Sequence, residues 1–166
     1  MKILVDADAC PVKEIIERIA KEHQLPVLMF IDTSHILYSD YSEIILVSKA
    51  PDAVDFALMN RTERGDIVIS QDYGVAAMAL GKGAYAIHPS GKLYNDSNID
   101  IMLMERDIAK QYRRAGTRQG GNSKTGGRTR VTTTGHAKKR TAADDDRFAK
   151  ALSDLCDRLC DNGNDT

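Results

Sequence analysis

The first 90 residues alternate short apolar runs with stretches whose apolar residues recur at helical spacing. The apolar runs have the length of buried strands and occupy residues 3–5, 26–31, 43–48, 66–70 and 84–88. Helical spacing begins after Pro11 and recurs over residues 51–60 and 72–80. Near-continuous apolar strands separated by helices are typical of a parallel sheet covered on both faces. The sequence therefore predicts a three-layer α/β fold with a central, mainly parallel sheet of about five strands flanked by helices.

The pattern changes beyond residue 90. Residues 98–115 have helical spacing, with apolar residues first and basic residues last, and helical spacing returns over residues 144–160. Between them, residues 116–140 contain six of the twelve glycines and many threonines, a low-complexity composition. We therefore expect an α/β domain over 1–115, a flexible basic segment over 116–143, and a C-terminal helix over 144–166 that packs on the domain.

Charge is segregated along the chain, although the formal net charge is only −1. Residues 1–105 contain 16 acidic and 9 basic residues, whereas residues 106–140 contain 11 basic residues and the single acid Asp107. Such asymmetry is typical of proteins with a polyanionic partner, and on charge alone it equally fits a solvated polar tail.

The composition, 42% apolar and 28% charged, is that of a globular protein. No apolar stretch approaches the ~20 residues that span a bilayer, so no membrane association is expected. The apolar run at the N-terminus meets Asp6 and is too short for a signal peptide. Three cysteines without an export signal predict reduced thiols and a cytoplasmic protein.

The most informative local feature is the segment DADACP, residues 6–11, directly after the first strand. If the extended conformation continues, Asp6 and Asp8 point to the same side and bring two carboxylates together. Open parallel sheets bind ligands outside the carboxyl ends of their strands, where this segment lies. The alternative is a capping turn, but that accounts for only one acid, and neighbouring carboxylates repel unless a cation or proton intervenes.

Two further acids fit the same edge of the sheet. Asp72 follows the strand at residues 66–70 and taken alone is best explained as the N-cap of the next helix. Together with Asp6 and Asp8 it favours a shared site. Asp52 suits the positive end of its helix, whereas Asp55 lies between Val54 and Phe56, where a buried acid needs a partner.

Carboxylates without a cysteine or histidine cluster suit hard cations such as Mg²⁺ or Mn²⁺. Such cations stabilise charge on a phosphate and prepare a water nucleophile. The acids Asp6, Asp8, Asp55 and Asp72 are therefore our candidate metal ligands and catalytic residues. The reaction class they favour is metal-dependent hydrolysis of phosphodiesters.

The segment VDADACPVK, residues 5–13, resembles the opening of the YaiI/YqxD family, a bacterial group also labelled UPF0178 or DUF188. The similarity continues at residues 65–72, 75–76, 91–94, 98–99, 104–107, 113–116 and 146–148. The family has no characterised function and is placed among PIN-like domains, whose better-known members are metal-dependent ribonucleases. The resemblance implies the same four acids as the metal site. Residues 120–141 are longer and more basic than the family's usual short link, so their role is not inherited.

Other chemistries fit less well. The segment DAD also resembles the nucleophile motif of haloacid-dehalogenase-like phosphatases, with Asp66 and Asp72 echoing their acidic motif. A strand separates those two acids, which places them about 15–20 Å apart at opposite edges of the sheet. Cys10 precedes a helix, but its acidic neighbours disfavour a thiolate. The histidines, including His35, have no ligand-like spacing and are expected to be structural or exposed.

The basic residues that could neutralise phosphates lie late in the chain. Aromatic residues are nearly absent there, which argues against base stacking and favours salt-dependent contacts with the nucleic-acid backbone. The sequence thus predicts a Mg²⁺- or Mn²⁺-dependent nuclease that acts on RNA. The alternative is a non-catalytic nucleic-acid-binding or scaffolding protein. The candidate nucleic-acid-binding residues are Lys110, Arg113, Arg114, Arg118, Lys138, Lys139 and Arg140.

Overall fold

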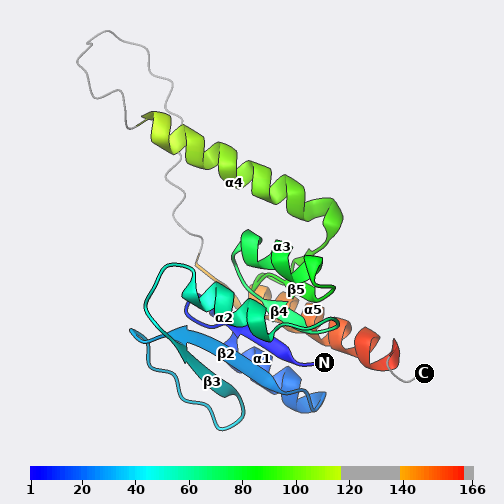
Figure 1. Cartoon of the computed structure of the whole chain (residues 1–166). Helices are drawn as coiled ribbons and strands as arrows, with labels where there is room; N and C mark the ends of the chain where they lie inside the picture. The colour runs from blue at the N-terminus through cyan, green and yellow to red at the C-terminus, as the bar shows by residue number, and fades with distance from the viewer. Residues whose placement is uncertain (117–138, 163–166) are drawn as a thin grey trace.

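A computed structural model of the chain describes residues 1–116 and 139–162. A six-stranded sheet forms its centre, in the order β3-β2-β1-β4-β5-β6 (Figure 1). The first five strands are parallel, and β6 is antiparallel to β5. The strands are β1 (Ile3–Asp6), β2 (Val27–Asp32), β3 (Glu43–Val47), β4 (Ile67–Ile69), β5 (Tyr85–Ile87) and β6 (Leu93–Tyr94). The predicted α/β fold with a mainly parallel sheet is confirmed.

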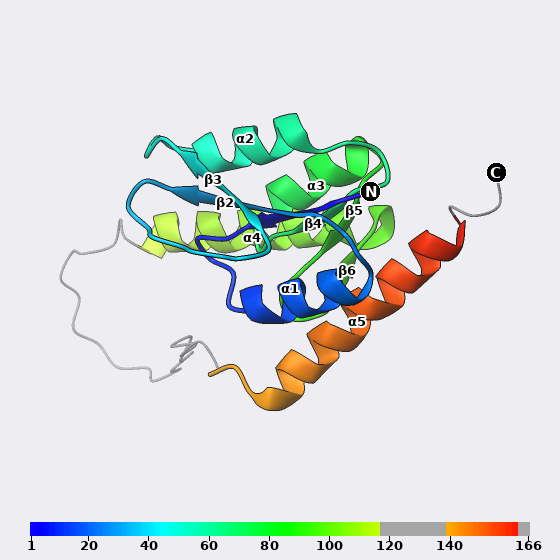
Figure 2. The same cartoon turned by 90° about the horizontal axis from the view of Figure 1, so that it is seen from below.

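Helices cover both faces of the sheet and complete three layers. One face carries α1 and α5, and the other carries α2, α3 and the first part of α4 (Figure 2). The helices are α1 (Lys13–Glu22), α2 (Ala53–Arg61), α3 (Tyr73–Gly81), α4 (Asp96–Gly116) and α5 (Ala142–Asn162). None of these described helices is long and apolar enough to cross a membrane.

The strands are apolar on both sides because each side meets a helical layer. In β1, Ile3 and Val5 pack toward α1 and α5, whereas Leu4 packs toward α2 and α3. All three side chains are fully buried. Burial of each such side chain contributes about 1.5–3 kcal/mol to the stability of the fold.

The C-terminal helix α5 joins the same core as α1. Phe148, Leu152, Leu155 and Cys156 are buried in one cluster with residues of α1 and of the strands. Their spacing is the helical periodicity that the sequence displays over residues 144–160, and the helix begins slightly earlier, at Ala142. Most of the segment 116–143, including Arg118 and Lys138, lies outside the described residues.

The sixth strand was not predicted. β6 has only two residues, Leu93 and Tyr94, and follows a turn at Gly91 whose φ is +89°. A run this short carries no periodicity of its own, and its pairing with β5 depends on the tertiary fold.

Candidate functional site

The order of the strands creates a topological switch point at the carboxyl ends of β1 and β4, and we call the region outside these ends the crevice. The chain proceeds from β1 outward through β2 to β3, then returns to the other side of β1 with β4. In an open parallel sheet this switch point is where ligands bind. Asp6 is the last residue of β1, and Ser70 and Asp72 directly follow β4. The fold therefore brings two of the predicted acids to neighbouring strand ends.

Ser70 links the two strand ends. Its hydroxyl donates a hydrogen bond to Oδ2 of Asp6 (3.2 Å) and accepts one from the backbone N–H of Asp72 (3.0 Å). Burial raises the pKa of Asp6, and the nearby carboxylates of Asp8 and Asp72 raise it further, against the lowering effects of Ser70 and Lys13. Ionisation of Asp6 is thus unfavourable unless a positive charge lies nearby.

Asp72 has the capping role that the sequence favoured for it taken alone, and its carboxylate also has a partner on α4. Its Oδ1 accepts hydrogen bonds from the backbone N–H groups of Gly74 (2.6 Å) and Val75 (3.2 Å), so it is the N-cap of α3. The same carboxylate faces the crevice, where Nη1 of Arg106 on α4 lies 3.4 Å from both of its oxygens. Through Arg106, α4 contacts the carboxylate of Asp72.

Asp55 approaches the same crevice from α2. Burial raises its pKa to about 6, and the charges of Asp72, Asp6 and Asp52 add to this effect, while Arg106 lowers it. The electrostatic effect of Asp6 and Asp72 on Asp55 indicates that the three carboxylates lie near one another.

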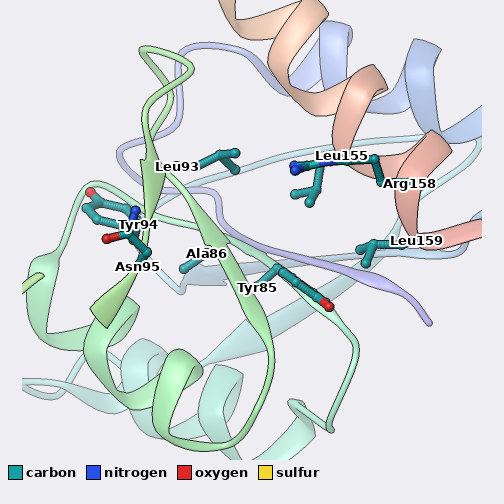
Figure 3. Close-up of a pocket in the computed structure, with 8 residues that line it drawn as sticks. All are labelled: Tyr85, Ala86, Leu93, Tyr94, Asn95, Leu155, Arg158 and Leu159. Carbon is teal, nitrogen blue, oxygen red and sulfur yellow. The ribbon is translucent and has the colours of Figure 1, made fainter. Parts of the chain in front are cut away.

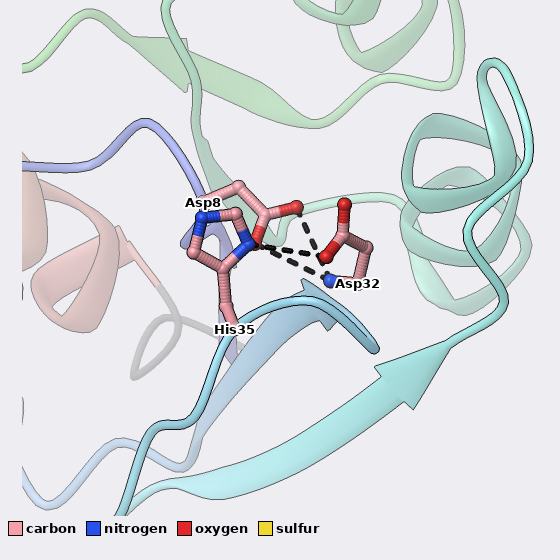
Figure 4. Close-up of side chains that lie close together, drawn as sticks. All are labelled: Asp8, Asp32 and His35. Atoms are coloured by element: carbon pink, nitrogen blue, oxygen red, sulfur yellow. Dashed lines mark hydrogen bonds and ion pairs between the residues drawn. The ribbon is translucent and has the colours of Figure 1, made fainter.

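Asp8 lies in the turn after β1 and contacts the end of β2. β1 ends at Asp6, and Ala7 still packs on the same face as Ile3 and Val5. The Asp8 carboxylate accepts hydrogen bonds from the backbone N–H of Asp32 (3.2 and 3.3 Å). Nδ1 of His35 lies 3.0 Å from it (Figure 4). Asp8 is still close enough to raise the pKa of Asp6.

Asp8, Asp32 and His35 form a group that the sequence patterns did not predict. One ligand-type atom from each lies within 4.8 Å of the others, and Nδ1 of His35 is 3.1 Å from Asp32. Hydrogen bonds from the Ser34 hydroxyl and N–H lower the pKa of Asp32 to about 2, and His35 contributes to this lowering. Asp32 is the last residue of β2, so the signal that identified Asp6 could also have identified it. His35 carries no comparable signal, and it is exposed, as expected.

The loop between β1 and α1 is held from two sides. Nζ of Lys13 donates to the carbonyls of Ala7 (2.9 Å) and Cys10 (2.7 Å), and the side chain of Gln71 donates to the carbonyl of Ala9 (2.7 Å). Cys10 is buried, which raises the pKa of its thiol. The loop is therefore a rigid support for Asp6 and Asp8, and Cys10 is not an activated nucleophile.

Asp66 does not belong to the crevice. It lies before β4, at the opposite edge of the sheet, and pairs with Nζ of Lys2 (2.8 Å). Backbone N–H groups of Lys2 and Glu63 also donate to it. Asp66 is a buried structural acid, and this removes the second motif of the phosphatase alternative.

A separate cavity of about 330 Å³ lies between α5 and the β5–β6 hairpin (Figure 3). No carboxylate lines it, so it is distinct from the predicted acidic site. Its lining residues are Tyr85, Ala86, Leu93, Tyr94, Asn95, Leu155, Arg158 and Leu159.

The predicted nucleic-acid-binding residues are only partly described. Lys110 is exposed on α4, and Arg113 and Arg114 belong to the last turns of the same helix. Lys139 is exposed, whereas Arg140 is half-buried and forms an ion pair with Asp145 at the start of α5. Arg140 is therefore partly engaged within the molecule.

Comparison with known proteins gives a consistent family match. Residues 4–130 match the model of the family described as uncharacterized, YaiI/YqxD, DUF188. A UPF0178 protein of Lachnoclostridium phytofermentans is 63% identical over 155 residues, which cover 93% of this chain and 96% of that protein. A UPF0178 protein of Clostridium acetobutylicum is 57% identical with the same coverage. One from Clostridium perfringens is 42% identical over 96% of this chain and 97% of that protein.

No solved structure matches the chain. The expected relation to PIN-like domains stays a prediction. The family match, by contrast, extends over most of the chain and includes the opening segment that carries Asp6 and Asp8. The chain belongs to the YaiI/YqxD family.

Proposed function

We propose that the protein is a Mg²⁺- or Mn²⁺-dependent phosphodiesterase whose substrate is RNA. The observation that carries this proposal is the proximity of Asp6, Asp55 and Asp72 near the switch point of the sheet, where burial, together with the charges of neighbouring acids, raises the pKa of Asp6 and of Asp55. The relation to PIN-like ribonucleases that the opening segment implies is part of the same proposal.

The residues of the crevice fit a hard cation. Their donors are carboxylate oxygens, the ligands that Mg²⁺ and Mn²⁺ prefer, and Cys10 is buried behind the loop. Burial and mutual repulsion make the ionised forms of Asp6 and Asp55 unfavourable, and a bound cation offsets both effects. Asp8 raises the pKa of Asp6 and belongs to the same proposed site.

Asp6, Asp55 and Asp72 would hold the divalent cation, which would supply Lewis-acid activation of a water and neutralisation of charge on the phosphate. The chain provides the remaining functions. Arg106 is positioned to exchange its contact with Asp72 for one with a substrate phosphate, because a guanidinium binds both groups in the same way. Lys110, with the other basic residues of the second half of the chain, would hold the RNA backbone.

A non-catalytic RNA-binding protein is the second candidate, and one contact favours it. Arg106 already supplies a positive charge to Asp72 within hydrogen-bonding distance, so part of the carboxylate charge is balanced by the chain itself. In that case the acids and Arg106 form a polar network that supports the fold, and no cation is needed.

The two candidates predict different behaviour of an Asp6→Asn variant. We expect the wild-type protein to cleave generic single-stranded RNA with Mn²⁺, and Asp6→Asn to lower the rate by about 100-fold or more because the substitution removes a metal ligand. The matched control is Asp161→Asn, the same chemical change at an exposed residue near the end of α5, which should leave the rate unchanged.

Thermal unfolding measures the binding of Mn²⁺ without requiring that RNA be cleaved. Mn²⁺ should raise the melting temperature of the wild-type protein, and Asp6→Asn should reduce that shift, because a ligand that binds the folded state stabilises it. Binding of RNA without cleavage, together with identical Mn²⁺ shifts in both proteins, would exclude the nuclease and support the binding protein.

A further inference from the structure

One stripe of α4 changes from apolar to basic along the length of the helix. Ile99 is buried, and Met102 and Leu103 are half-buried, in the cluster that α4 shares with α3 and the sheet. Arg106 and Lys110 continue the same stripe, because positions 99, 102, 106 and 110 recur at intervals of three and four. The stripe is therefore apolar where α4 packs on the domain and basic further along, where the helix extends beyond α3 (Figure 1).

The charges of α4 are also segregated around the helix. Its four basic residues fall on this one side, since Arg113 and Arg114 follow Lys110 by three and four positions. Helical spacing places Asp107 at one border of the stripe and Glu105 on the other side, and both acids are exposed. A stripe of positive charge with carboxylates beside it is suited to one narrow polyanion.

The basic part of the stripe begins at the crevice. Nη1 of Arg106 lies 3.4 Å from both oxygens of Asp72, the N-cap of α3. Lys110 is exposed and has no hydrogen bond or ion pair within the described part of the chain. At a rise of ~1.5 Å per residue, Lys110 lies about 6 Å and Arg113 about 10 Å further along the helix axis than Arg106. These intervals are long enough to reach successive phosphates of one strand, which are about 3.4 Å apart along the axis of a stacked helix.

We propose that Arg106, Lys110 and Arg113 form a track along α4 for the backbone of a single RNA strand, on one side of the phosphate held at the crevice. This inference rests on the proposed function and adds the path of the substrate to it. Lys110 is then a positioning residue, because it contacts the backbone away from the reacting phosphate. A duplex fits less well, since Glu105 and Asp107 beside the track repel the phosphates of a second strand.

Two substitutions of equal charge change test the track. Lys110→Gln and Gln111→Glu each lower the net charge by one, at exposed neighbouring positions on different sides of α4. For a single-stranded oligouridylate of about eight nucleotides, in about 0.1 M salt without divalent cations, Lys110→Gln should weaken binding about three- to tenfold. Lys110→Arg should restore the affinity, and Gln111→Glu should change it much less. Fluorescence anisotropy measures all four proteins. Equal losses for Lys110→Gln and Gln111→Glu, or an unchanged affinity of Lys110→Gln, would overturn the inference.

The number of strands is tested with an RNA duplex of the same length. The wild-type protein should bind it more weakly than the single strand, and equal binding with the same dependence on Lys110 would contradict a single-strand track. With Mn²⁺, Lys110→Gln should raise KM more than it lowers kcat, because the lost contact lies outside the reacting phosphate. If the wild-type protein cleaves no RNA, the proposed function fails, whereas the binding comparison of Lys110→Gln with Gln111→Glu still decides the track.

Discussion

The acidity of Asp55 depends strongly on its surroundings. It lies on α2, and burial together with Asp72 and Asp6 raises its pKa from the ordinary 3.8 to about 6. The folded protein therefore holds this proton more tightly than the unfolded chain does. The stability that this contributes is fully present below pH 3.8 and is lost as the pH rises through about 6.

The Asp55→Asn variant is predicted to remove this dependence on pH. Without divalent cations, the free energy of unfolding of the wild-type protein should fall relative to the variant between about pH 4 and 7, by on the order of 1 kcal/mol after solvent screening. Urea denaturation of both proteins at about pH 4.5 and about pH 7.5 measures the difference. An equal difference at the two pH values would contradict a raised pKa at Asp55.

The residues of the candidate site differ in how far the sequence alone could predict them. Asp6 and Asp72 follow apolar strands, and Asp55 is flanked by apolar residues, so local sequence identified all three. The predicted proximity of Asp6 and Asp8 is consistent with the effect of Asp8 on the pKa of Asp6. The association of His35 with the acids depends on the path of the loop after β2, which the local sequence does not encode.

At the scale of elements, α5 depends on a close backbone contact with the turn between β5 and β6. Gly91 has a φ of +89°, and a Cβ atom there would lie 2.9 Å from the carbonyl oxygen of Arg147 and 3.1 Å from Cα of Phe148. Both the conformation and the space therefore require glycine. This contact explains how a helix late in the chain is positioned over the sheet.

A comparison of Gly91→Ala with Gly65→Ala should separate the effect of the positive φ from the effect of the missing space for a Cβ atom. Gly65 also has a positive φ, +83°, but no atom lies within 4 Å of a Cβ built there. Gly65→Ala should cost about 1 kcal/mol for backbone strain, and Gly91→Ala about 2–3 kcal/mol or more because α5 must also shift. Chemical denaturation measures both values, and equal losses of stability would indicate that the contact with α5 is unimportant.

At the scale of the whole molecule, the segregation of charge along the chain can be related to positions in the structure. The acidic crevice lies on the face covered by α2, α3 and α4, and Arg106 connects α4 to it. Figure 1 shows α4 extending beyond α3. Under the proposed function, the acids would hold a cation and the basic residues late in the chain would contact a phosphate chain.

The salt dependence of RNA binding should follow the basic residues beyond α4. A variant with glutamine at Arg118, Lys124, Arg128, Arg130 and Lys138 keeps the chain length and removes five positive charges. The slope of log affinity against log salt should become shallower by about 0.7 for each phosphate that the variant no longer neutralises. Fluorescence anisotropy with single-stranded RNA at several salt concentrations measures that slope.

The control for this experiment replaces Lys150 and Arg158 with glutamine. Both residues are exposed on α5, which lies on the opposite face of the sheet from α4. Their removal should leave the slope unchanged. If the five-residue variant also keeps the wild-type slope, the basic stretch is a solvated linker and not a binding segment.

The sequence by itself determined the elements and their class. Apolar runs of strand length and stretches of helical spacing are local patterns, and local patterns suffice to predict strands, helices and a parallel sheet. They also determined that Asp6 and Asp72 lie at one edge, because parallel strands align their carboxyl ends. The strand β6 could not be predicted in this way, because two residues are too few to show a periodicity.

Only the tertiary structure decided which strands are neighbours. The order of the sheet places β1 beside β4, which joins Asp6 to Asp72 through Ser70, and it leaves β3 at the edge with Leu46 exposed. It also directs Asp8 toward β2. Strand order is set by the packing of helices on both faces and by long-range pairing, and these interactions connect residues far apart in the chain. The physical reason is therefore that the elements are encoded locally, whereas the site and the open edge arise from contacts between them.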